Sequence, residues 1–208
     1  WDKVSLIGHS MGAGLNFLFA SLFPKNVDIM IGIDGFKPPT YEPPTVVRLL
    51  EGRVKNFALA DKRNRENTEP PAYSIEEMSE KLSKATRGSI TKELAPYLLR
   101  RNVRKSEKFV EKYYFTRDSR LKYIMDSSIS QNVSVELAKR IDMPYLYFKA
   151  SKSPYFERRE YHDEIVKVLQ EQNQDFSFHM IDAPHHLHLS TPEKVSEIMS
   201  DFIKKYKK

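Results

Sequence analysis

A short apolar run that leads directly into a glycine-flanked serine constrains this fold more than any other sequence feature. The run Val4-Ser5-Leu6-Ile7 is typical of a buried strand, and it stops at Gly8. From residue 12 to residue 23, leucine and phenylalanine recur at helical spacing until Pro24 ends the pattern. A second apolar run follows at Ile29–Ile33. A strand, a helix and a second strand in this order predict the parallel crossover unit of an α/β sheet.

The sheet pattern stops after the second strand and returns about a hundred residues later. Four prolines between residues 37 and 44 interrupt it, and Ser74 with Glu77 forms a capping-box signature further on. Polar, amphipathic helices are predicted over 46–62, 74–87, 91–101 and 135–141. The later elements are predicted as a strand over 145–148, a helix over 156–172, a strand over 176–181 and a closing helix over 192–205. We therefore predict a sheet-bearing part over 1–37, a helical cap over 38–140 and a second sheet-bearing part over 141–208.

Composition excludes several classes of protein. Of the 208 residues, 40% are hydrophobic, which is far more than a disordered chain carries and is enough for a packed core. Cys is absent, so the chain has no disulfide, no thiolate metal site and no Cys nucleophile. No uncharged apolar run approaches the roughly 20 residues that a membrane span needs.

Positive charge is concentrated in the predicted cap. Between Arg48 and Lys122 there are 19 Lys and Arg residues against 11 Asp and Glu residues, whereas the formal charge of the whole chain is +6. The basic residues alternate with acids at helical spacing, as between Glu76 and Lys84. This pattern indicates solvated helix faces, and no nucleic-acid motif accompanies it. We expect neither a nucleic-acid partner nor a membrane span, and docking on acidic partners is a weaker alternative.

Gly8-His9-Ser10-Met11-Gly12 is a G-x-S-x-G pentapeptide placed between the first predicted strand and the first predicted helix. A serine on the strained turn at such a place has its hydroxyl exposed at the top of the sheet. We predict that a Cβ at either flanking glycine would clash with the neighbouring strand or helix. The amide of Met11 and the positive end of the helix face the oxygen that becomes negative in acyl transfer. The motif thus predicts a nucleophilic Ser10, with the Met11 amide as one oxyanion donor.

A serine hydroxyl needs a general base, and in this chain order the base is expected near the C-terminal end. The loop after the last predicted strand contains His185, His186 and His188. We choose His185, because it directly follows Ala183-Pro184, where a tight turn directs it over the sheet. A metal site is the alternative, but neither a Cys nor a spaced set of acidic ligands lies nearby. No metal or cofactor is expected, and His186 and His188 are interpreted mainly as hydrogen-bonding loop residues.

The pentapeptide at 8–12, the late His185 and Pro192 seven residues after it together resemble the α/β-hydrolase superfamily. More narrowly, the chain is similar to the serine hydrolase-like proteins, the Kraken-like group. Five segments support the resemblance. Residues 4–14 and 185–192 are specific to the superfamily, and the narrower similarity rests on 23–34, 114–121, and 149–150 with 155–156. It implies the C-terminal part of an α/β-hydrolase fold, a parallel sheet flanked by helices, with a helical cap insertion.

The resemblance also implies that the nucleophile follows the fifth of about eight strands. Four earlier strands, with a His-Gly-type loop that donates the second oxyanion amide, would then lie outside these 208 residues. The strand at Val4–Ile7 would present a bare apolar edge. We expect residues 1–208 alone to be unstable and essentially inactive, and a stable, catalytically competent preparation of them would overturn this expectation.

The acid that orients the histidine is less clearly marked in the sequence. In most relatives it follows the strand here predicted at 145–148, in a Gly-x-x-Asp stretch, but this chain has Ala-Ser-Lys-Ser, ending at the uncharged Ser153. Some α/β-hydrolases take the acid from the end of the strand after the nucleophile helix, which here is Asp34. We expect Asp34 to be the acid, with Glu157 or Asp163 as alternatives and capping of the next turn as its purely structural alternative.

These features predict a serine hydrolase that cleaves ester or related acyl bonds of small, partly apolar molecules without a cofactor. The alternative is a non-catalytic ligand-binding protein on the same scaffold, which the uncharged Ser153 favours. The expected location is intracellular, either cytoplasmic or peroxisomal. Aromatic residues of the predicted cap either line its pocket or pack inside the cap, namely Tyr97, Phe109, Tyr113, Tyr114, Phe115 and Tyr123.

Overall fold

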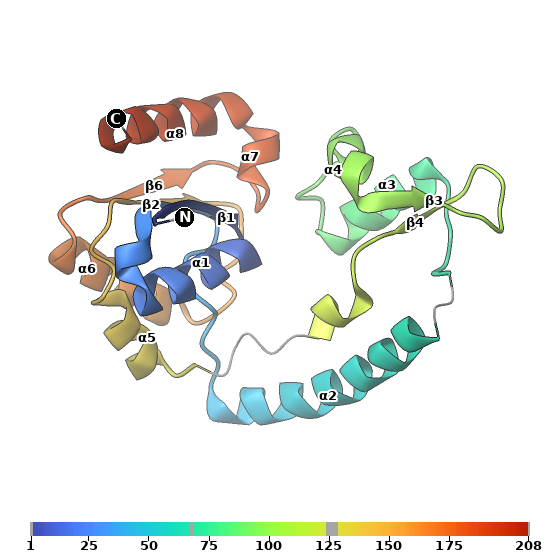
Figure 1. Ribbon diagram of the computed structural model, residues 1–208, viewed down its shortest axis with the longest axis horizontal. Coiled ribbons are helices and arrows are strands. Elements are labelled where there is room, and N and C mark those ends of the chain that lie inside the picture. Colours follow the sequence, from blue (N-terminus) through green and yellow to red (C-terminus); the bar gives the residue numbers. More distant parts are fainter. Residues whose placement is uncertain (1, 67–68, 124–128, 208) are drawn as a thin grey trace. The chain divides into compact units, whose positions relative to one another are not determined.

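The computed structural model describes residues 2–66, 69–123 and 129–207, and the chain divides into two compact units. The first unit contains Trp1–Pro43 and Asp126–Lys208, and the second contains Pro44–Met125. Figure 1 shows the course of the chain from its blue beginning to its red end. The first unit is therefore built from two separate stretches of sequence.

The first unit is organised around a four-stranded parallel sheet with strand order β1-β2-β5-β6. Its strands are β1 (Val4–His9), β2 (Val27–Ile33), β5 (Tyr145–Ala150) and β6 (Phe176–Ile181). Because every pair is parallel, all four carboxyl ends lie at one edge of the sheet. The neighbours β2 and β5 come from opposite sides of the second unit in the sequence. Distant segments thus end side by side at the edge where open parallel sheets bind ligands.

Helices cover both faces of this sheet, because parallel strands need crossover connections. One face is covered by α1 (Met11–Leu22), α5 (Gln131–Ala138) and α6 (Arg159–Gln172). The other is covered by α7 (Leu187–Ser190) and α8 (Pro192–Tyr206), as Figure 1 shows. A short 3-10 helix, η1 (Pro24–Asn26), connects α1 to β2. The predicted α/β class, a parallel sheet flanked by helices, is confirmed.

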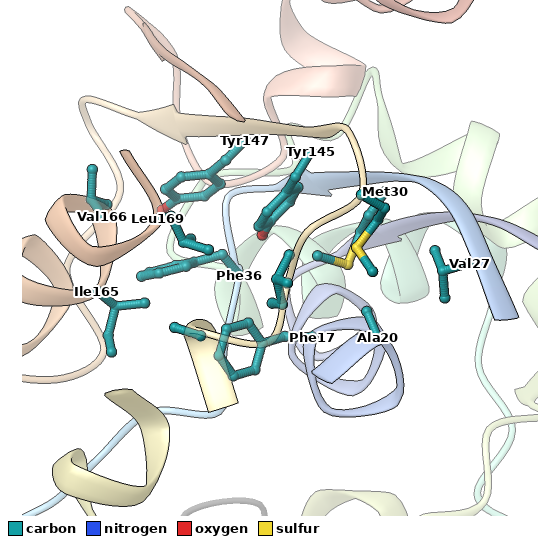
Figure 2. Packing of buried hydrophobic residues seen from close by; sticks show 13 residues of the cluster. Phe17, Ala20, Val27, Met30, Phe36, Tyr145, Tyr147, Ile165, Val166 and Leu169 are labelled. Atoms are coloured by element: carbon teal, nitrogen blue, oxygen red, sulfur yellow. The ribbon is translucent and has the colours of Figure 1, made fainter. Parts of the chain in front are cut away.

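The larger apolar cluster lies between the sheet and the helices α1, α5 and α6 (Figure 2). Met30 of β2 and Tyr145 and Tyr147 of β5 project toward Phe17 of α1 and Leu169 of α6. None of these five side chains is more than 1% exposed. Burial of a side chain of this kind contributes roughly 1.5–3 kcal/mol, so this cluster holds the two central strands firmly against the helices.

The opposite face of the sheet has an apolar cluster of its own. Ile29 and Ile31 of β2 and Leu146 of β5 pack with Val195 and Phe202 of α8. Successive side chains of a strand point to opposite faces, so a strand that is buried on both faces must be apolar at successive positions. This is why residues 29–33 of β2 and 145–148 of β5 contain no charged residue in the sequence.

The strand β1 lies at the edge of the sheet and pairs only with β2 among the described strands. Ile7 of β1 is 53% exposed, and the adjacent helix α1 exposes Leu15, Phe19 and Leu22. An apolar strand edge of this kind favours unwanted pairing in an isolated sheet. The bare edge predicted for Val4–Ile7 is found at β1, and the instability of residues 1–208 alone stays a prediction.

The second unit is mainly helical. It contains α2 (Pro43–Arg65) except for its first residue, α3 (Ile75–Ala85), α4 (Ala95–Asn102), the antiparallel strands β3 (Val103–Lys105) and β4 (Tyr113–Phe115), and the 3-10 helix η2 (Ser119–Tyr123). Ser74 and Glu77 cap α3 through hydrogen bonds in both directions, as the capping-box signature predicts. The longest helix, α2, has 23 residues, but neither it nor any other described helix is long and apolar enough to cross a membrane.

The second unit has a small core built on α3 and α4. Met78 of α3 and Leu99 of α4 are buried at its centre, and Tyr113 and Phe115 of β4 pack against it. These contacts favour internal packing over pocket lining for the two aromatic residues. Tyr97, by contrast, is 72% exposed.

Several elements differ from their predicted form for local reasons. The helix predicted over 135–141 is α5, which begins four residues earlier because the Ser130 side chain accepts a hydrogen bond from the amide of Val133. Pro43 and Pro44 form the start of α2 rather than interrupting it, because the first amides of a helix need no intrahelical partner. The elements β3, β4 and α7 are three or four residues long, too short for a periodic signal.

The two compact units change over at residues 43–44 and 125–126. The sequence predicts changes after residues 37 and 140 instead. Those predicted boundaries describe a hydrolase core and a cap, and they stay predictions of domain organisation.

Truncation of the buried Leu169 is expected to destabilise the protein far more than the same truncation at the next position. Leu169 is 0% exposed in the main cluster, so Leu169→Ala should lower the free energy of unfolding by about 3 kcal/mol. Gln170 is exposed on the same helix, so Gln170→Ala should change it by less than about 0.5 kcal/mol. Urea denaturation of the two variants measures both values, and similar values would contradict the packing described for α6.

Candidate active site

Ser10 lies at a sharp turn between β1 and α1. The strand ends at His9 and the helix begins at Met11, so a single residue makes the reversal. Its φ of 54° and ψ of −117° lie where residues other than glycine are rarely found. The Ser10 amide donates to the carbonyl of Ile33 (3.0 Å), and the Ser10 carbonyl accepts from the amide of Ala13 (3.1 Å). Hydrogen bonds to β2 and α1 thus hold the strained backbone in place.

Close backbone packing requires glycine at two positions around Ser10 but not at a third. A Cβ on Gly8 would lie 2.5 Å from the carbonyl carbon of Gly12, and a Cβ on Gly35 would lie 2.6 Å from the carbonyl oxygen of Ser10. A Cβ on Gly12 would meet nothing within 4 Å. The predicted clash is therefore confirmed at Gly8 and is wrong at Gly12, which lies in the first turn of α1 beside open space.

Three segments of the first unit bring Ser10, His185 and Asp34 into one hydrogen-bonded row. His185 lies between β6 and α7, and its Nε2 is 2.9 Å from Oγ of Ser10. Its Nδ1 is 2.5 Å from Oδ2 of Asp34, the residue directly after β2. The parallel sheet creates this meeting, because the strands before all three residues end at the same edge. The three residues chosen from the sequence are adjacent in space, and their chemical roles stay predictions.

Asp34 is buried, and its carboxylate is fully hydrogen-bonded. Its Oδ1 accepts from the amide of Ala150 (2.9 Å) and from the ammonium of Lys149 (2.8 Å), while Oδ2 faces His185. Burial by itself raises the pKa of a carboxyl group, but hydrogen bonds from His185, Lys149, Ser153 and Ala150 outweigh it and lower the pKa of Asp34 to about 2. The charged carboxylate favours the tautomer of His185 with a proton on Nδ1, which leaves Nε2 as an acceptor.

The two alternative acids are engaged elsewhere in the first unit. Glu157 forms an ion pair with the buried Lys37 and also accepts from the amide of Thr40 (2.9 Å). Asp163 is half-exposed, and its Oδ1 lies 2.9 Å from Nδ1 of His162. The structure brings Asp34, rather than either of these residues, to the imidazole of His185.

A cluster of neutral histidines surrounds the backbone of His185. The ring of His9 lies 4.6, 4.8 and 4.5 Å from the rings of His185, His186 and His188, and its Nε2 is 3.0 Å from the carbonyl oxygen of His185. Burial, followed by repulsion among the rings, lowers the pKa of His9 to about 3 and that of His186 to about 4, and it also lowers the pKa of His188. Across the described part of the chain, no three His, Cys, Asp or Glu residues are grouped so that they could hold a metal ion.

Met11 provides the first amide of α1. The first four amides of a helix have no carbonyl partner within it, and the helix dipole is positive at that end. Such an amide is available to an anionic oxygen next to Ser10. Its role as an oxyanion donor stays a prediction.

The sequence reasoning missed two residues that shape this site. Gly35 permits the contact between the turn after β2 and the backbone of Ser10, and Lys149 binds the carboxylate of Asp34. A signal for Lys149 was present, because it is the only charged residue in the apolar strand β5. Ser153 lies near the imidazole, with its Oγ 3.4 Å from Nδ1 of His185, but it carries no charge.

The fold and this site define a known class of protein. The sequence pattern of the alpha/beta hydrolase fold family matches residues 1–192 of the chain. The protein therefore belongs to the alpha/beta hydrolase fold family, as the resemblance in its sequence indicates.

Two curated relatives carry the narrower similarity. The chain is 28% identical over 205 residues to a probable serine hydrolase of Drosophila melanogaster, covering 98% of this chain and 61% of the relative. It is 29% identical over 208 residues to a serine hydrolase-like protein of Danio rerio, with the same two coverages of 98% and 61%. The chain thus spans 61% of the length of these relatives, and its predicted similarity to serine hydrolase-like proteins is confirmed.

A solved structure supports the fold independently. The structure of a hypothetical protein from Pseudomonas aeruginosa PAO1 matches with a TM-score of 0.76 and 22% identity, covering 98% of this chain and 68% of that one. At this identity the likeness establishes the arrangement of the elements.

Alanine at Gly8 and alanine at Gly12 are expected to have different effects. Gly8→Ala places a Cβ 2.5 Å from backbone atoms and should lower the free energy of unfolding by about 3 kcal/mol. Gly12→Ala replaces a helical glycine beside open space and should leave this free energy unchanged or raise it by up to about 1 kcal/mol. Chemical denaturation of both variants gives the comparison, and equal losses would refute the packing explanation of the motif.

Acidification from pH 7 to pH 5 is expected to destabilise the protein through His9. The pKa of His9 is about 3 in the folded protein against an ordinary value of 6.5, so between these values the unfolded chain binds a proton that the folded chain does not. Stability therefore falls as the pH drops through 6.5, by up to about 2 kcal/mol at pH 5. Urea denaturation at both pH values measures this loss, and the non-titrating variant His9→Asn should show a smaller one. An unchanged pH response in His9→Asn would show that other groups carry it.

Proposed function

We propose that the protein is a serine hydrolase that cleaves ester or related acyl bonds of small, partly apolar molecules. The observation that carries this proposal is the row of hydrogen bonds from Ser10 through His185 to Asp34, with distances of 2.9 and 2.5 Å. The curated relatives, a probable serine hydrolase and a serine hydrolase-like protein, support the same class of chemistry. Because the chain spans 61% of these relatives, the activity is proposed for the full-length protein that contains it.

In the proposed first step, Ser10 attacks the carbonyl carbon of the bound ester. Nε2 of His185, 2.9 Å from Oγ, accepts the hydroxyl proton while the bond from Oγ to carbon forms. The carbonyl electron pair moves onto the oxygen, which becomes an oxyanion. The Met11 amide, at the positive end of α1, donates a hydrogen bond to that oxygen.

The second half of the proposed cycle returns the serine to its starting state. The imidazolium of His185 protonates the leaving alcohol as the carbon–oxygen bond breaks, and the acyl group remains on Ser10. A water molecule then gives a proton to His185 while its oxygen attacks the acyl carbon, and His185 protonates Oγ as the acid product leaves. Asp34, with a pKa of about 2, stays ionised and stabilises each imidazolium. Every proton that His185 accepts in this cycle is returned to the leaving alcohol or to Ser10, so the cycle needs no cofactor.

An apolar surface next to His185 supports a partly apolar substrate. The ring of Phe156 is 5.2 Å from the ring of His185 in an edge-to-face contact, and Phe156 is 52% exposed. An exposed aromatic ring beside the general base favours an acyl or alcohol group with apolar surface, because binding removes that surface from water.

A ligand-binding protein without catalysis is the alternative on the same scaffold. It was favoured by the uncharged Ser153 at the position where most relatives carry the acid. The hydrogen bond that Nδ1 of His185 donates to Asp34 gives the imidazole a charged partner, so the uncharged Ser153 no longer favours the alternative. We therefore propose catalysis as the function.

Two substitutions test the proposal in the full-length protein. A fluorophosphonate probe should label the wild type but not Ser10→Ala, and Ser10→Ala should lose about 10⁴-fold or more in kcat. Asp34→Asn should lose about 10⁴-fold in kcat, because the imidazole loses its charged partner and its tautomer. A panel of esters of different acyl chain length provides the substrates.

Matched variants separate these losses from general damage. Ser196→Ala changes a serine on α8, and Asp163→Asn changes an exposed acid that lies beside His162. Both should keep near-normal turnover. Absence of labelling in the full-length wild type would overturn the proposal, and labelling with no turnover on any ester would favour the ligand-binding alternative.

A further inference from the structure

Lys149 is a buried lysine that the proposed reaction does not use. Its side chain is 5% exposed, and its Nζ donates to Oδ1 of Asp34 (2.8 Å), to the carbonyl of Ala150 (2.9 Å) and to the carbonyl of Ser153 (3.1 Å). These three bonds use all three N–H groups of the ammonium. The ring centroid of Tyr155 lies 4.9 Å from Nζ. The ammonium is therefore fixed in one position at the edge of the sheet where β5 ends.

Stability alone does not account for a charge at this position. A buried ion pair recovers little more than the cost of its desolvation, and an apolar pair of similar volume often serves equally well. The position of the ammonium does have a consequence for Asp34. Lys149 and the Ala150 amide occupy Oδ1, so the carboxylate is held with Oδ2 toward His185.

We propose that Lys149 is a positioning residue that orients Asp34 and sets the pH range in which His185 acts as a base. The ammonium restrains rotation of the carboxylate by holding Oδ1. It also offsets part of the carboxylate charge, so that Asp34 stabilises a protonated His185 less than an unpaired carboxylate would. This inference rests on the proposed hydrolase function and adds a residue to it.

The other titratable groups around the Asp34–His185 pair are neutral at neutral pH, so the positive charge beside the carboxylate comes from Lys149. Among the described residues, the titratable and charged groups near the pair or its neighbours include His9 at the end of β1, Tyr147 and Lys149 on β5, Tyr155 after β5, and His186 and His188 on the loop of His185. Burial holds the pKa of Tyr147 well above its ordinary value, so this side chain is neutral. Burial lowers the pKa of His9, His186 and His188, so these rings are neutral at neutral pH. Among the residues that the structure describes, Lys149 is the lysine whose ammonium contacts the carboxylate.

The test compares pH profiles of kcat/KM for the full-length wild type, Lys149→Met and Lys149→Gln. Methionine removes the charge and the donors, whereas glutamine removes the charge but keeps a donor for the buried carboxylate. Each variant is expected to shift the half-maximal pH of the acidic limb upward by about one unit, because an unpaired Asp34 holds a proton on His185 more strongly. Lys149→Met should also lose roughly tenfold in kcat on the plateau, because the carboxylate is no longer restrained.

Two controls separate this role from a structural one. Lys152→Met changes a nearby lysine that is 62% exposed and paired with Asp182, and its profile should superimpose on that of the wild type. Thermal unfolding shows whether each variant is folded.

The outcomes distinguish failure of this inference from failure of the proposed function. Folded Lys149→Met and Lys149→Gln proteins with the wild-type pH profile overturn the role of Lys149 and leave the hydrolase proposal intact. Failure of both neutral variants to fold makes Lys149 a structural residue and also overturns that role. A wild type that neither hydrolyses any ester nor reacts with a fluorophosphonate overturns both proposals.

Discussion

The hydrogen bond between Oδ2 of Asp34 and Nδ1 of His185 joins the two stretches of sequence that form the sheet-bearing unit. Asp34 ends the first stretch of strands, and His185 follows the last strand of the second. Their meeting depends on the parallel register of β2 with β5, in which Ile33 is opposite Phe148. The amide of Asp34 continues that ladder by donating to the carbonyl of Phe148 (2.7 Å). A shift of this register would move the carboxylate away from the imidazole.

The same ladder supports two strained residues. Ser10 and Asp34 both have positive φ, 54° and 42°, which costs each of them roughly 1–3 kcal/mol. The Ser10 amide is bonded to the carbonyl of Ile33, and the Asp34 amide to the carbonyl of Phe148. Ile33 and Phe148 are themselves buried in the cluster beneath α8. Apolar packing on both faces of the central strands thus fixes the backbone that directs two polar side chains to one histidine.

The sequence predicts most accurately those features that depend on neighbouring residues. Phe176–Ile181 has the same bounds in the structure as in the prediction, because apolar residues that alternate with polar ones form a local pattern. The turn at Ser10 is equally local, since a glycine-flanked serine between a strand and a helix defines it. The helix boundary near Ser130 depends on one capping bond, which periodicity does not reveal.

Features that depend on contacts across the sheet are harder to predict. Asp34 was one of three candidate acids, because its distance from His185 is set by the strand order and not by its spacing in the chain. Lys149 interrupts an apolar run, which marks it as unusual, but the sequence does not say which anion it contacts. Gly12 shows the opposite error, since its place in the motif suggested a clash although its surroundings are open. Each of these cases depends on whether atoms from distant segments of the sequence lie nearby, which the local sequence pattern does not show.

The segment that leaves the sheet after β2 is held by two buried ion pairs. Asp34 pairs with Lys149, and three residues later Lys37 pairs with Glu157. The hydroxyl of Thr40 also donates to the carbonyl of Ile129 (3.3 Å). This hydrogen bond connects the segment that precedes the second unit in the sequence with the segment that follows it. These contacts all lie within the first unit, which also contains the row from Ser10 to Asp34. Segments that connect strands at the carboxyl edge of a parallel sheet can generally vary in shape while the sheet keeps its geometry.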